Sequence, residues 1–496
     1  MNQYLLLVLA ILGLACSSDK SSNSSSGPPK DARAIDSAVE ADSDSSSSAD
    51  ILRELPPVTP VISSAIAIEN PANALSYFIE WETDIPVPTV LDVECQDEYF
   101  RHFESTNFFT SHSVFVMGLI PGTSCSATIT AGISPHASKV ILVLDEIGPV
   151  PDRFPLLDCQ LSDPERMYPG WTFWSLSNAT KGDQALIMAL DEQCRYRWYH
   201  FGSSSIKAGA GKEIQAIEGG LLLAAGGPEY FLGWDGKPFW EAPFDAHHDM
   251  RFSPWNENHL LYLAISKKNC ETSEHMIVEY NMDSGEQIWN WRICEHYTPT
   301  LSYHNWSHVN TIEPFPGERA ILVSPRDQDV LLKVNRDTDN IEWVLGWGGD
   351  FAMEQEAYFV RQHAPMILEN GDILMFDNGL SKKESNKTDE GHKVREYSRA
   401  LQLHLTFDGN TPVNADIAWD YTDETLYASA RSEADRLPNG NTLIAYSQLA
   451  GLQNSMMLEV TEDKEIVWQL ISPPNWSTYR AERIAPFFGD IRSTVK

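Results

Sequence analysis

Basic residues are scarce in this sequence of 496 residues. Lysine and arginine together number 36 against 70 aspartates and glutamates, which gives a formal net charge of −34 at pH 7. Proteins bind nucleic acid through clusters of Lys and Arg that neutralise phosphates, so this balance argues against a nucleic-acid partner. An anionic small substrate would also be repelled at long range, and its binding therefore requires a local positive pocket.

Long apolar runs are missing beyond the N-terminus. The run Y-L-L-L-V-L-A-I-L-G-L-A has about a dozen residues, too few for a helix that spans a bilayer. It is followed by Cys16 and two serines, which is the pattern of a bacterial lipoprotein signal peptide over residues 1–16. We therefore predict an exported protein, periplasmic or anchored to the outer membrane by a lipid on Cys16. A plain secretory signal is the alternative.

Cysteines are few. There are 7 in all, so six remain when Cys16 is set aside, an even number that suits disulfides in an oxidising compartment. Pairing of sequence neighbours predicts the bridges Cys95–Cys125, Cys159–Cys194 and Cys270–Cys294, and other connectivities stay open.

Changes in composition divide the chain, which is too long for a single core, into several parts. Residues 17–55 are rich in Ser and Asp and have almost nothing to bury, so we predict a solvated tether. Residues 56–150 hold alternating segments such as L-S-Y-F-I-E-W and T-V-L-D-V-E-C, which predict a small β-sandwich. Its later segment, S-V-F-V-M-G-L-I-P-G-T-S-C-S-A-T-I-T-A, resembles the strand, turn and strand of a fibronectin type III module.

Residues 151–496 repeat one pattern, in which short apolar strands and polar turns lead to a strand that carries a tryptophan. The successive separations of these tryptophans are 42, 49, 54, 76 and 49 residues. A period of about 40 to 50 residues with several strands is typical of propeller blades. We therefore predict an all-β chain whose larger domain is a six-bladed β-propeller, with the polar insertion S-K-K-E-S-N-K-T-D-E-G-H-K as a loop. The tryptophans are Trp198, Trp240, Trp289, Trp343, Trp419 and Trp468.

Basic side chains flank the apolar strands at related positions in successive repeats. Because the innermost strand of each propeller blade begins near the axis, we expect these side chains to meet at one central site. They are His247 and His248 in A-H-H-D-M-R-F, His308 in W-S-H-V-N, Arg326 in V-S-P-R-D-Q-D and His363 in R-Q-H-A-P. The other histidines of the repeats, His259, His275, His296, His392 and His404, are interpreted as surface residues.

In this order, the motifs resemble those of the bacterial arylsulfate sulfotransferases and their arylsulfotransferase-like relatives. The matching pieces include H-H-D, S-H-V-N-T-I, L-V-S-P-R-D-Q-D-V-L-L-K-V-N, F-D-N-G and the terminal Y-R-A-E-R-I, over about residues 165–487. The resemblance implies a six-bladed propeller that moves a sulfuryl group from an aryl sulfate to a phenol without the nucleotide donor PAPS. It implies that His363 is transiently sulfated, and it assigns His308, Arg326 and His248 to the other catalytic positions.

The chemistry of these side chains agrees with the roles that the resemblance implies. Neutral imidazole is a nucleophile near neutral pH, and guanidinium offers forked donors to tetrahedral oxyanions. We predict that His363 attacks sulfur while Arg326 and His308 hold the equatorial oxygens. His248 or His308 would protonate the leaving phenolate and later deprotonate the acceptor in a ping-pong scheme.

Two further residues, His247 and Asn310, are expected to lie at the substrate, His247 by orienting its neighbour. The expected partners are a small aryl sulfate and a phenol; no metal or cofactor is expected, and a homodimer stays open. One alternative is an exported propeller without activity that binds a glycan or a protein. Another is a quinone-dependent dehydrogenase, which the sequence disfavours because it has no adjacent pair of cysteines and no acidic cluster for calcium among the axis residues.

Overall fold

The computed structural model describes residues 58–96, 100–178, 186–201, 213–224, 229–266, 274–299, 306–381, 395–451 and 453–485. In these ranges the chain forms β-strands, with one short α-helix, α3 (Ile293–His296), and one 3-10 helix, η1 (Arg326–Gln328). The all-β prediction is therefore confirmed for the described part of the chain. The predicted signal peptide with Cys16, the tether and all of the polar insertion except Ser381 lie outside it.

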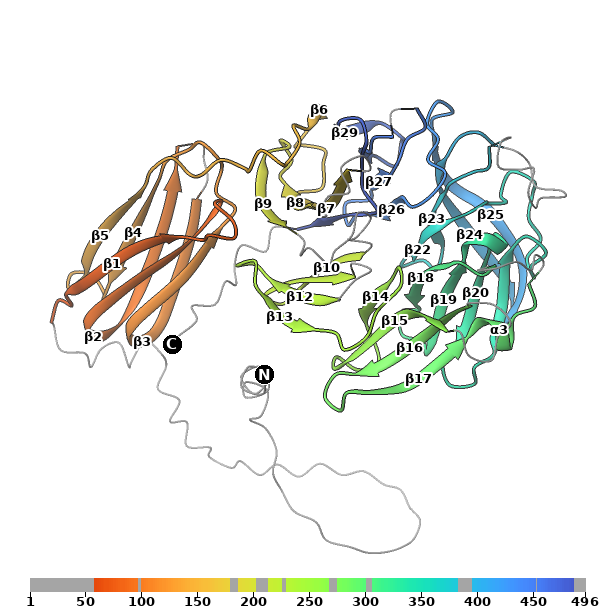
Figure 1. Cartoon of the computed structure of the whole chain (residues 1–496), viewed down its shortest axis with the longest axis horizontal. Coiled ribbons are helices and arrows are strands. Elements are labelled where there is room, and N and C mark those ends of the chain that lie inside the picture. Colours follow the sequence, from red (N-terminus) through yellow and green to blue (C-terminus); the bar gives the residue numbers. More distant parts are fainter. Residues whose placement is uncertain are drawn as a thin grey trace, which may run out of the picture.

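The first domain is a group of five antiparallel strands: β1 (Ile62–Glu69), β2 (Ser76–Cys95), β3 (Phe100–Met117), β4 (Cys125–Ala131) and β5 (Ser138–Leu144). The order is β1-β2-β4-β5, and β3 also pairs with β2. Alternate residues of β2 and β4 are buried, as expected for strands with one face on a core. Figure 1 shows these strands as a body beside the rest of the chain. The fibronectin type III assignment stays a prediction.

The long strand β2 differs from expectation. The segments L-S-Y-F-I-E-W and T-V-L-D-V-E-C were expected as separate short strands, and Pro86 and Pro88 lie between them. The structure runs them into one strand and places the prolines where the register with β3 shifts, between Glu82 and Thr89. Such an irregularity accommodates residues that lack the N–H for the ladder.

Two predicted disulfides are confirmed. Cys95 on β2 bonds to Cys125, which is its register partner on β4. Cys159 in the strand β6 (Asp158–Ser162) bonds to Cys194. Cys294 is also disulfide-bonded, and its predicted partner, Cys270, lies outside the described residues. Disulfides persist in oxidising compartments, so these bridges indicate an exported protein.

Hydrogen bonds join the first domain to the second. The side-chain amide of Asn73 donates to the backbone carbonyl of Tyr199 at 3.1 Å, and the Tyr199 hydroxyl accepts the backbone N–H of Ala74 at 2.8 Å. Asn70 donates in the same way to the carbonyl of Asp235, at 3.1 Å. The connection between β1 and β2 is therefore fixed against the outer strands and turns of two sheets of the second domain.

The second domain contains four sheets whose strands follow the chain order. They comprise β10 (Glu213–Ile217), β11 (Gly220–Ala224), β12 (Tyr230–Gly233) and β13 (Pro238–Glu241); β14 (Met250–Phe252), β15 (His259–Ser266), β16 (Glu274–Asn281) and β17 (Glu286–Arg292); β18 (Val309–Pro314), β19 (Ala320–Pro325), β20 (Val330–Asn335) and β21 (Ile341–Gly346); and β22 (His363–Ile367), β23 (Ile373–Asp377), β24 (Arg399–Asp408) and β25 (Thr411–Thr422).

Two more sheets connect distant parts of the chain. One contains β26 (Glu433–Arg436), β27 (Thr442–Tyr446), β28 (Met456–Val460) and β29 (Ile466–Ile471), and β29 pairs with β6 from the start of the domain. The other contains β7 (Trp171–Asn178), β8 (Leu186–Leu190) and β9 (Tyr196–Phe201), and β7 pairs with both β30 (Trp476–Ser477) and β31 (Ala481–Ile484). Figure 1 shows the sheets following one another in a ring, with the first and last parts of the domain side by side. The arrangement is consistent with a propeller.

The repeated tryptophans have a common place in this fold. Each lies in the fourth strand of its sheet, from Trp198 in β9 to Trp468 in β29. Three of them donate the indole N–H to the turn before the fourth strand of the next sheet: Trp198 to the carbonyl of Trp234, Trp289 to the carboxylate of Asp339, and Trp419 to the carbonyl of Glu462. The repeat is visible in the sequence because each of these side chains ties one sheet to the next.

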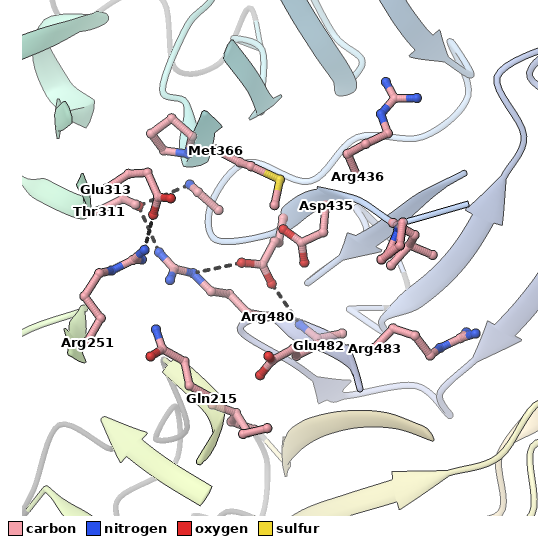
Figure 2. A pocket seen from close by; sticks show the side chains of 18 residues that line it. Gln215, Arg251, Thr311, Glu313, Met366, Asp435, Arg436, Arg480, Glu482 and Arg483 are labelled. Carbon is pink, nitrogen blue, oxygen red and sulfur yellow. Dashed lines mark hydrogen bonds and ion pairs between the residues drawn. The ribbon is translucent and has the colours of Figure 1, made fainter. Parts of the chain in front are cut away.

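The first strands of the sheets surround a central cavity of about 400 Å³. Its lining contains both acidic and basic side chains, and Figure 2 shows Arg251, Glu313 and Arg480 meeting near its centre. Residues of β10, β14, β18, β22, β26 and β31 contribute, including Gln215, Arg251, Glu313, Met366, Asp435 and Glu482. The first strand of every sheet therefore borders one axis, which is the geometry that the sequence analysis requires.

None of the helices in the described ranges combines the length and the hydropathy needed to cross a membrane.

Candidate active site

Five sheets bring a side chain to the same end of the axis, at the position where the first strand begins. His248 and Arg431 come two residues before β14 and β26, His308 one residue before β18, and Tyr479 two residues before β31; His363 is the first residue of β22. Ala364 and Arg480, which directly follow His363 and Tyr479, and Thr311, three residues after His308, line the central cavity. The predicted histidines and two unpredicted residues therefore surround one end of that cavity.

His363 is the most enclosed of these histidines, with 2% of its surface exposed. Its Nδ1 lies 2.6 Å from Oδ1 of Asn378 and 3.1 Å from the carbonyl of Arg361, and both are acceptors. Asn378 cannot turn its amide around, because its Nδ2 donates to the carbonyls of Ala428 and Arg431. Nδ1 therefore carries the proton, and Nε2 keeps a lone pair, which accepts the backbone N–H of Arg431 at 3.2 Å.

The surroundings of His363 keep its ring neutral. Burial lowers its pKa most, and the positive charge of Arg326 lowers it further; His308 and Arg480 act in the same direction. The hydrogen bond to Asn378 raises the pKa only in part, so that it lies well below the ordinary value of 6.5. A neutral imidazole with an unprotonated Nε2 is the form that attacks an electrophile.

This lowered pKa predicts how stability depends on pH. The unfolded chain titrates at the ordinary pKa of 6.5, so below that pH it binds a proton that the folded state does not. The contribution of His363 to stability is therefore fully present above pH 6.5 and is lost as the pH falls below it. Between about pH 7 and about pH 5, we expect the melting temperature of His363→Gln to fall less than that of the wild type. Equal slopes would contradict the assignment, and His136→Gln, at an exposed site in the first domain, is the control.

Arg326 and His308 are placed beside each other by the pairing of β18 with β19. The backbone N–H of Arg326 donates to the carbonyl of His308 at 3.3 Å. The guanidinium of Arg326 is bound to Asp327 and donates to the carbonyl of Ser429 at 3.2 Å. Asp327 also lies 3.8 Å from Nδ1 of His308. The buried Nε of Arg326 has no acceptor within the described part of the chain, so one donor of the fork is left for a ligand.

Tyr479 is a site residue that the sequence analysis missed. Its hydroxyl lies 2.8 Å from Nδ1 of His248, and its ring centroid is 6.5 Å from that of His363. Burial raises the pKa of Tyr479, and Arg480 and Arg431 oppose the rise. The hydroxyl therefore stays protonated and orients the ring of His248. The terminal motif Y-R-A-E-R-I was a signal for this residue, because it belongs to the ordered set of motifs.

Arg480 directly follows Tyr479 and lines the central cavity. Its Nη2 donates to Oγ1 of Thr311 at 2.9 Å and to the carbonyl of Asn310 at 3.2 Å. Its guanidinium also lies 3.8 Å from Asp249 and 3.7 Å from Glu433. Figure 2 shows this side chain reaching toward Thr311 and Glu313. Arg480 adds positive charge that the sequence analysis did not assign to the site.

Asn310, which was expected at the substrate, is fully buried behind His363. Its Nδ2 donates to the carbonyl of Gln362 at 2.8 Å and so holds the residue before His363. Its Oδ1 has no hydrogen-bond partner among the described residues.

His247 lies in a group of rings that the sequence analysis did not foresee. Its ring centroid is 4.0 Å from that of His248, and its Nδ1 lies 2.9 Å from Nε2 of His275. His275, on β16, was interpreted as a surface residue, and this is wrong, because only 1% of it is exposed. His296 and His404 are exposed and His259 is partly buried, whereas His392 lies outside the described residues.

Comparisons with known proteins bear on the same region. Residues 162–480 match the model of a family described as Arylsulfotransferase (ASST). No curated protein matches the chain. Among solved structures, the chain is similar to Hsv2 of Kluyveromyces lactis, with 10% identity and a TM-score of 0.31 over 75% of this chain and 95% of that one. It is also similar to the tricorn protease, with 10% identity and a TM-score of 0.26 over 82% of this chain and 39% of that one. Likeness at these scores says nothing about activity.

Proposed function

This chain belongs to the arylsulfotransferase (ASST) family, and on that premise we propose that it is a PAPS-independent arylsulfate sulfotransferase. It moves a sulfuryl group from an aryl sulfate to a phenol through a sulfohistidine intermediate on His363. The observation that carries the proposal is the state of His363, a buried imidazole with its proton held on Nδ1 by Asn378 and with positive charge around it.

In the first half-reaction, Nε2 of His363 attacks the sulfur of the aryl sulfate. The nitrogen–sulfur bond forms while the bond from sulfur to the aryl oxygen breaks, and the leaving phenolate takes a proton from His248 or His308. Nε2 gives up the N–H of Arg431 at this step, so that N–H becomes a donor for a sulfuryl oxygen. Arg326, with an unused Nε, stabilises the charge on the same oxygens.

The second half-reaction reverses these events with a different phenol. The group that protonated the leaving phenolate now takes the proton of the acceptor, whose oxygen attacks sulfur and breaks the bond to His363. The aryl sulfate product then leaves with His363 again neutral. His248, held by the hydroxyl of Tyr479 at 2.8 Å, and His308, 5.2 Å away between ring centroids, are both placed for this proton transfer.

The architecture that supports this site is a six-bladed propeller over residues 151–496, with the six sheets as its blades. Pairing of β31 with β7 closes the ring and removes the open edges of the sheets. The five strands over residues 56–150 form a fibronectin type III-like sandwich in this proposal. The disulfides support export, with attachment to the outer membrane through a lipid on Cys16 or a free periplasmic form.

The proposal is tested by steady-state kinetics with p-nitrophenyl sulfate as donor and phenol as acceptor. A sulfohistidine intermediate predicts p-nitrophenol release that depends on phenol and gives parallel double-reciprocal lines when both substrates are varied. Intersecting lines would instead indicate direct transfer between the two substrates without a covalent intermediate. Absence of release with several aryl sulfates would favour a propeller that binds a glycan or a protein instead.

Tyr479→Phe is predicted to lower kcat by about tenfold to a hundredfold, because the loss of the hydroxyl frees the ring of His248 that transfers the proton. The change removes one oxygen and leaves the packing of the ring in place. Tyr446→Phe on β27 is the matched control, because that buried hydroxyl has no hydrogen-bond partner among the described residues. Measurement of kcat against pH distinguishes a structural role of the hydroxyl from a role in proton transfer. A structural role predicts an unchanged pH profile of kcat, whereas a role in proton transfer predicts that one limb of this profile shifts.

A further inference from the structure

Three histidines beside the proposed sulfuryl site bring their ring nitrogens together. His247, His248 and His275 each offer one ligand atom, and these atoms all lie within 4.8 Å of one another. Two of the residues precede β14, and the third is on β16 of the same sheet. Such a group was not expected from the sequence, because His275 was interpreted as a surface residue.

We propose that these three histidines bind a divalent transition-metal ion such as Zn²⁺. Neutral imidazole is a preferred ligand of Zn²⁺, with a metal–nitrogen distance of about 2.0–2.1 Å, so two nitrogens of a tetrahedral site are about 3.4 Å apart. Nδ1 of His247 and Nε2 of His275 lie 2.9 Å apart. A shift of less than about an ångström therefore turns this contact into one edge of a tetrahedron.

The groups behind the three rings fit this role. Oγ of Ser307 lies 3.2 Å from Nδ1 of His275, which orients the ring so that Nε2 faces His247. The backbone N–H of His247 donates to the carbonyl of Leu263 at 2.7 Å, and the hydroxyl of Tyr479 holds Nδ1 of His248. Ligand histidines in proteins are oriented through their second ring nitrogen or their backbone in this way.

Three histidine ligands leave one position of a tetrahedral ion for water or an anion. The ring of His308 lies near the three ligands, with its centroid 5.2 Å from that of His248 and 6.2 Å from that of His275. The inference does not rest on the proposed function, because binding of the ion needs no aryl sulfate. Since His248 belongs to both sites, occupancy of the metal site would withdraw it from proton transfer and lower the rate of sulfuryl transfer.

The test is a calorimetric titration of the purified full-length protein, stripped of metal with a chelator, using Zn²⁺ alone. We expect one ion per chain and a rise of the melting temperature with Zn²⁺ concentration. His275→Ala and His247→Gln should abolish the one-to-one binding. Ser307→Ala should weaken it by about 10- to 100-fold, because it releases the ring of His275. His136→Gln, at an exposed site in the first domain, should bind as the wild type does.

Two results would overturn the inference: no one-to-one binding by the wild type, or binding of unchanged affinity in both histidine variants. If His275→Ala does not fold, as judged by circular dichroism, His247→Gln decides the question. Absorption bands of a four-coordinate ion after loading with Co²⁺, and their loss in His247→Gln, give a second readout that is independent of activity. A wild type that binds Zn²⁺ but transfers no sulfuryl group would support this inference and contradict the proposed function.

Discussion

In the His363→Ala variant, we expect the phenol-dependent release of p-nitrophenol from p-nitrophenyl sulfate to fall by at least about 10⁴-fold. Losses of this size follow removal of a nucleophile from a site whose residues act as a unit. No other histidine in the described part of the chain is set up in the same way, with Nδ1 protonated by contact with Asn378 and Nε2 directed at the backbone of Arg431. His308 and His248 keep their places in the variant, yet neither becomes the acceptor of the sulfuryl group.

The intermediate itself provides the second measurement. Wild-type protein that is mixed with donor and quenched without a phenol should gain the mass of one sulfuryl group on the peptide that contains His363. His363→Ala should gain none. Because the residue is buried, His363→Asn is made alongside it to retain a polar side chain, and melting curves check that both variants fold. Normal turnover in either variant, or sulfation of another histidine in the wild type, would overturn the role of His363.

The sequence predicted the blade-like repeat well because a tryptophan occupies the fourth strand of each sheet in the second domain. The indoles of Trp198, Trp289 and Trp419 each reach the turn of the following sheet, so the period of the tryptophans is the period of the sheets. The histidines at the starts of β14, β18 and β22 were also recognisable in the sequence, because polar motifs there interrupt alternating apolar strands. Local pattern was sufficient wherever sequence neighbours pair in order.

Tyr479 and Arg431 were missed for a different reason. Tyr479 enters the site because β31, near the end of the chain, pairs with β7 near the start of the domain. No local pattern predicts a pairing across some hundreds of residues. The motif Y-R-A-E-R-I marked this segment as one of the ordered set of motifs, but it did not indicate that Tyr479 faces the site. Arg431 contacts His363 through its backbone N–H. Its positive φ of 61° depends on the fold and cannot be predicted from the residue type.

The burial of His275 shows that the alternation of residues along a strand does not predict which histidines are exposed in this fold. Along β16, His275, Ile277 and Glu279 point to one face, and all three are buried. In a sandwich with one wet face, the polar members of such a pattern would point to solvent. Sheets that are covered on both faces bury polar side chains from either face, so alternation alone could not separate His275 from an exposed histidine such as His404.

Arg326→Ala is expected to lower kcat/KM by about 10²- to 10³-fold, the loss that follows removal of one donor aimed at developing negative charge. Arg326→Lys should recover only part of this, because an ammonium keeps the charge but not the fork. Arg319→Ala, which breaks an exposed ion pair with Asp337, is the matched control and should leave the rate unchanged.

A merely structural role of Arg326 would also reduce the rate. The pH dependence of kcat/KM therefore distinguishes a structural role from an electrostatic role at His363. Arg326 is the strongest of the charges that lower the pKa of His363, and its removal must therefore raise that pKa toward 6.5. Below its pKa, His363 is protonated and cannot attack sulfur, so the acid limb of kcat/KM should move to higher pH in Arg326→Ala and stay in place in Arg326→Lys. A loss of rate with the acid limb unmoved in Arg326→Ala would mean that the guanidinium does not face His363, and the pairing of these two residues in one sulfuryl site would then fail.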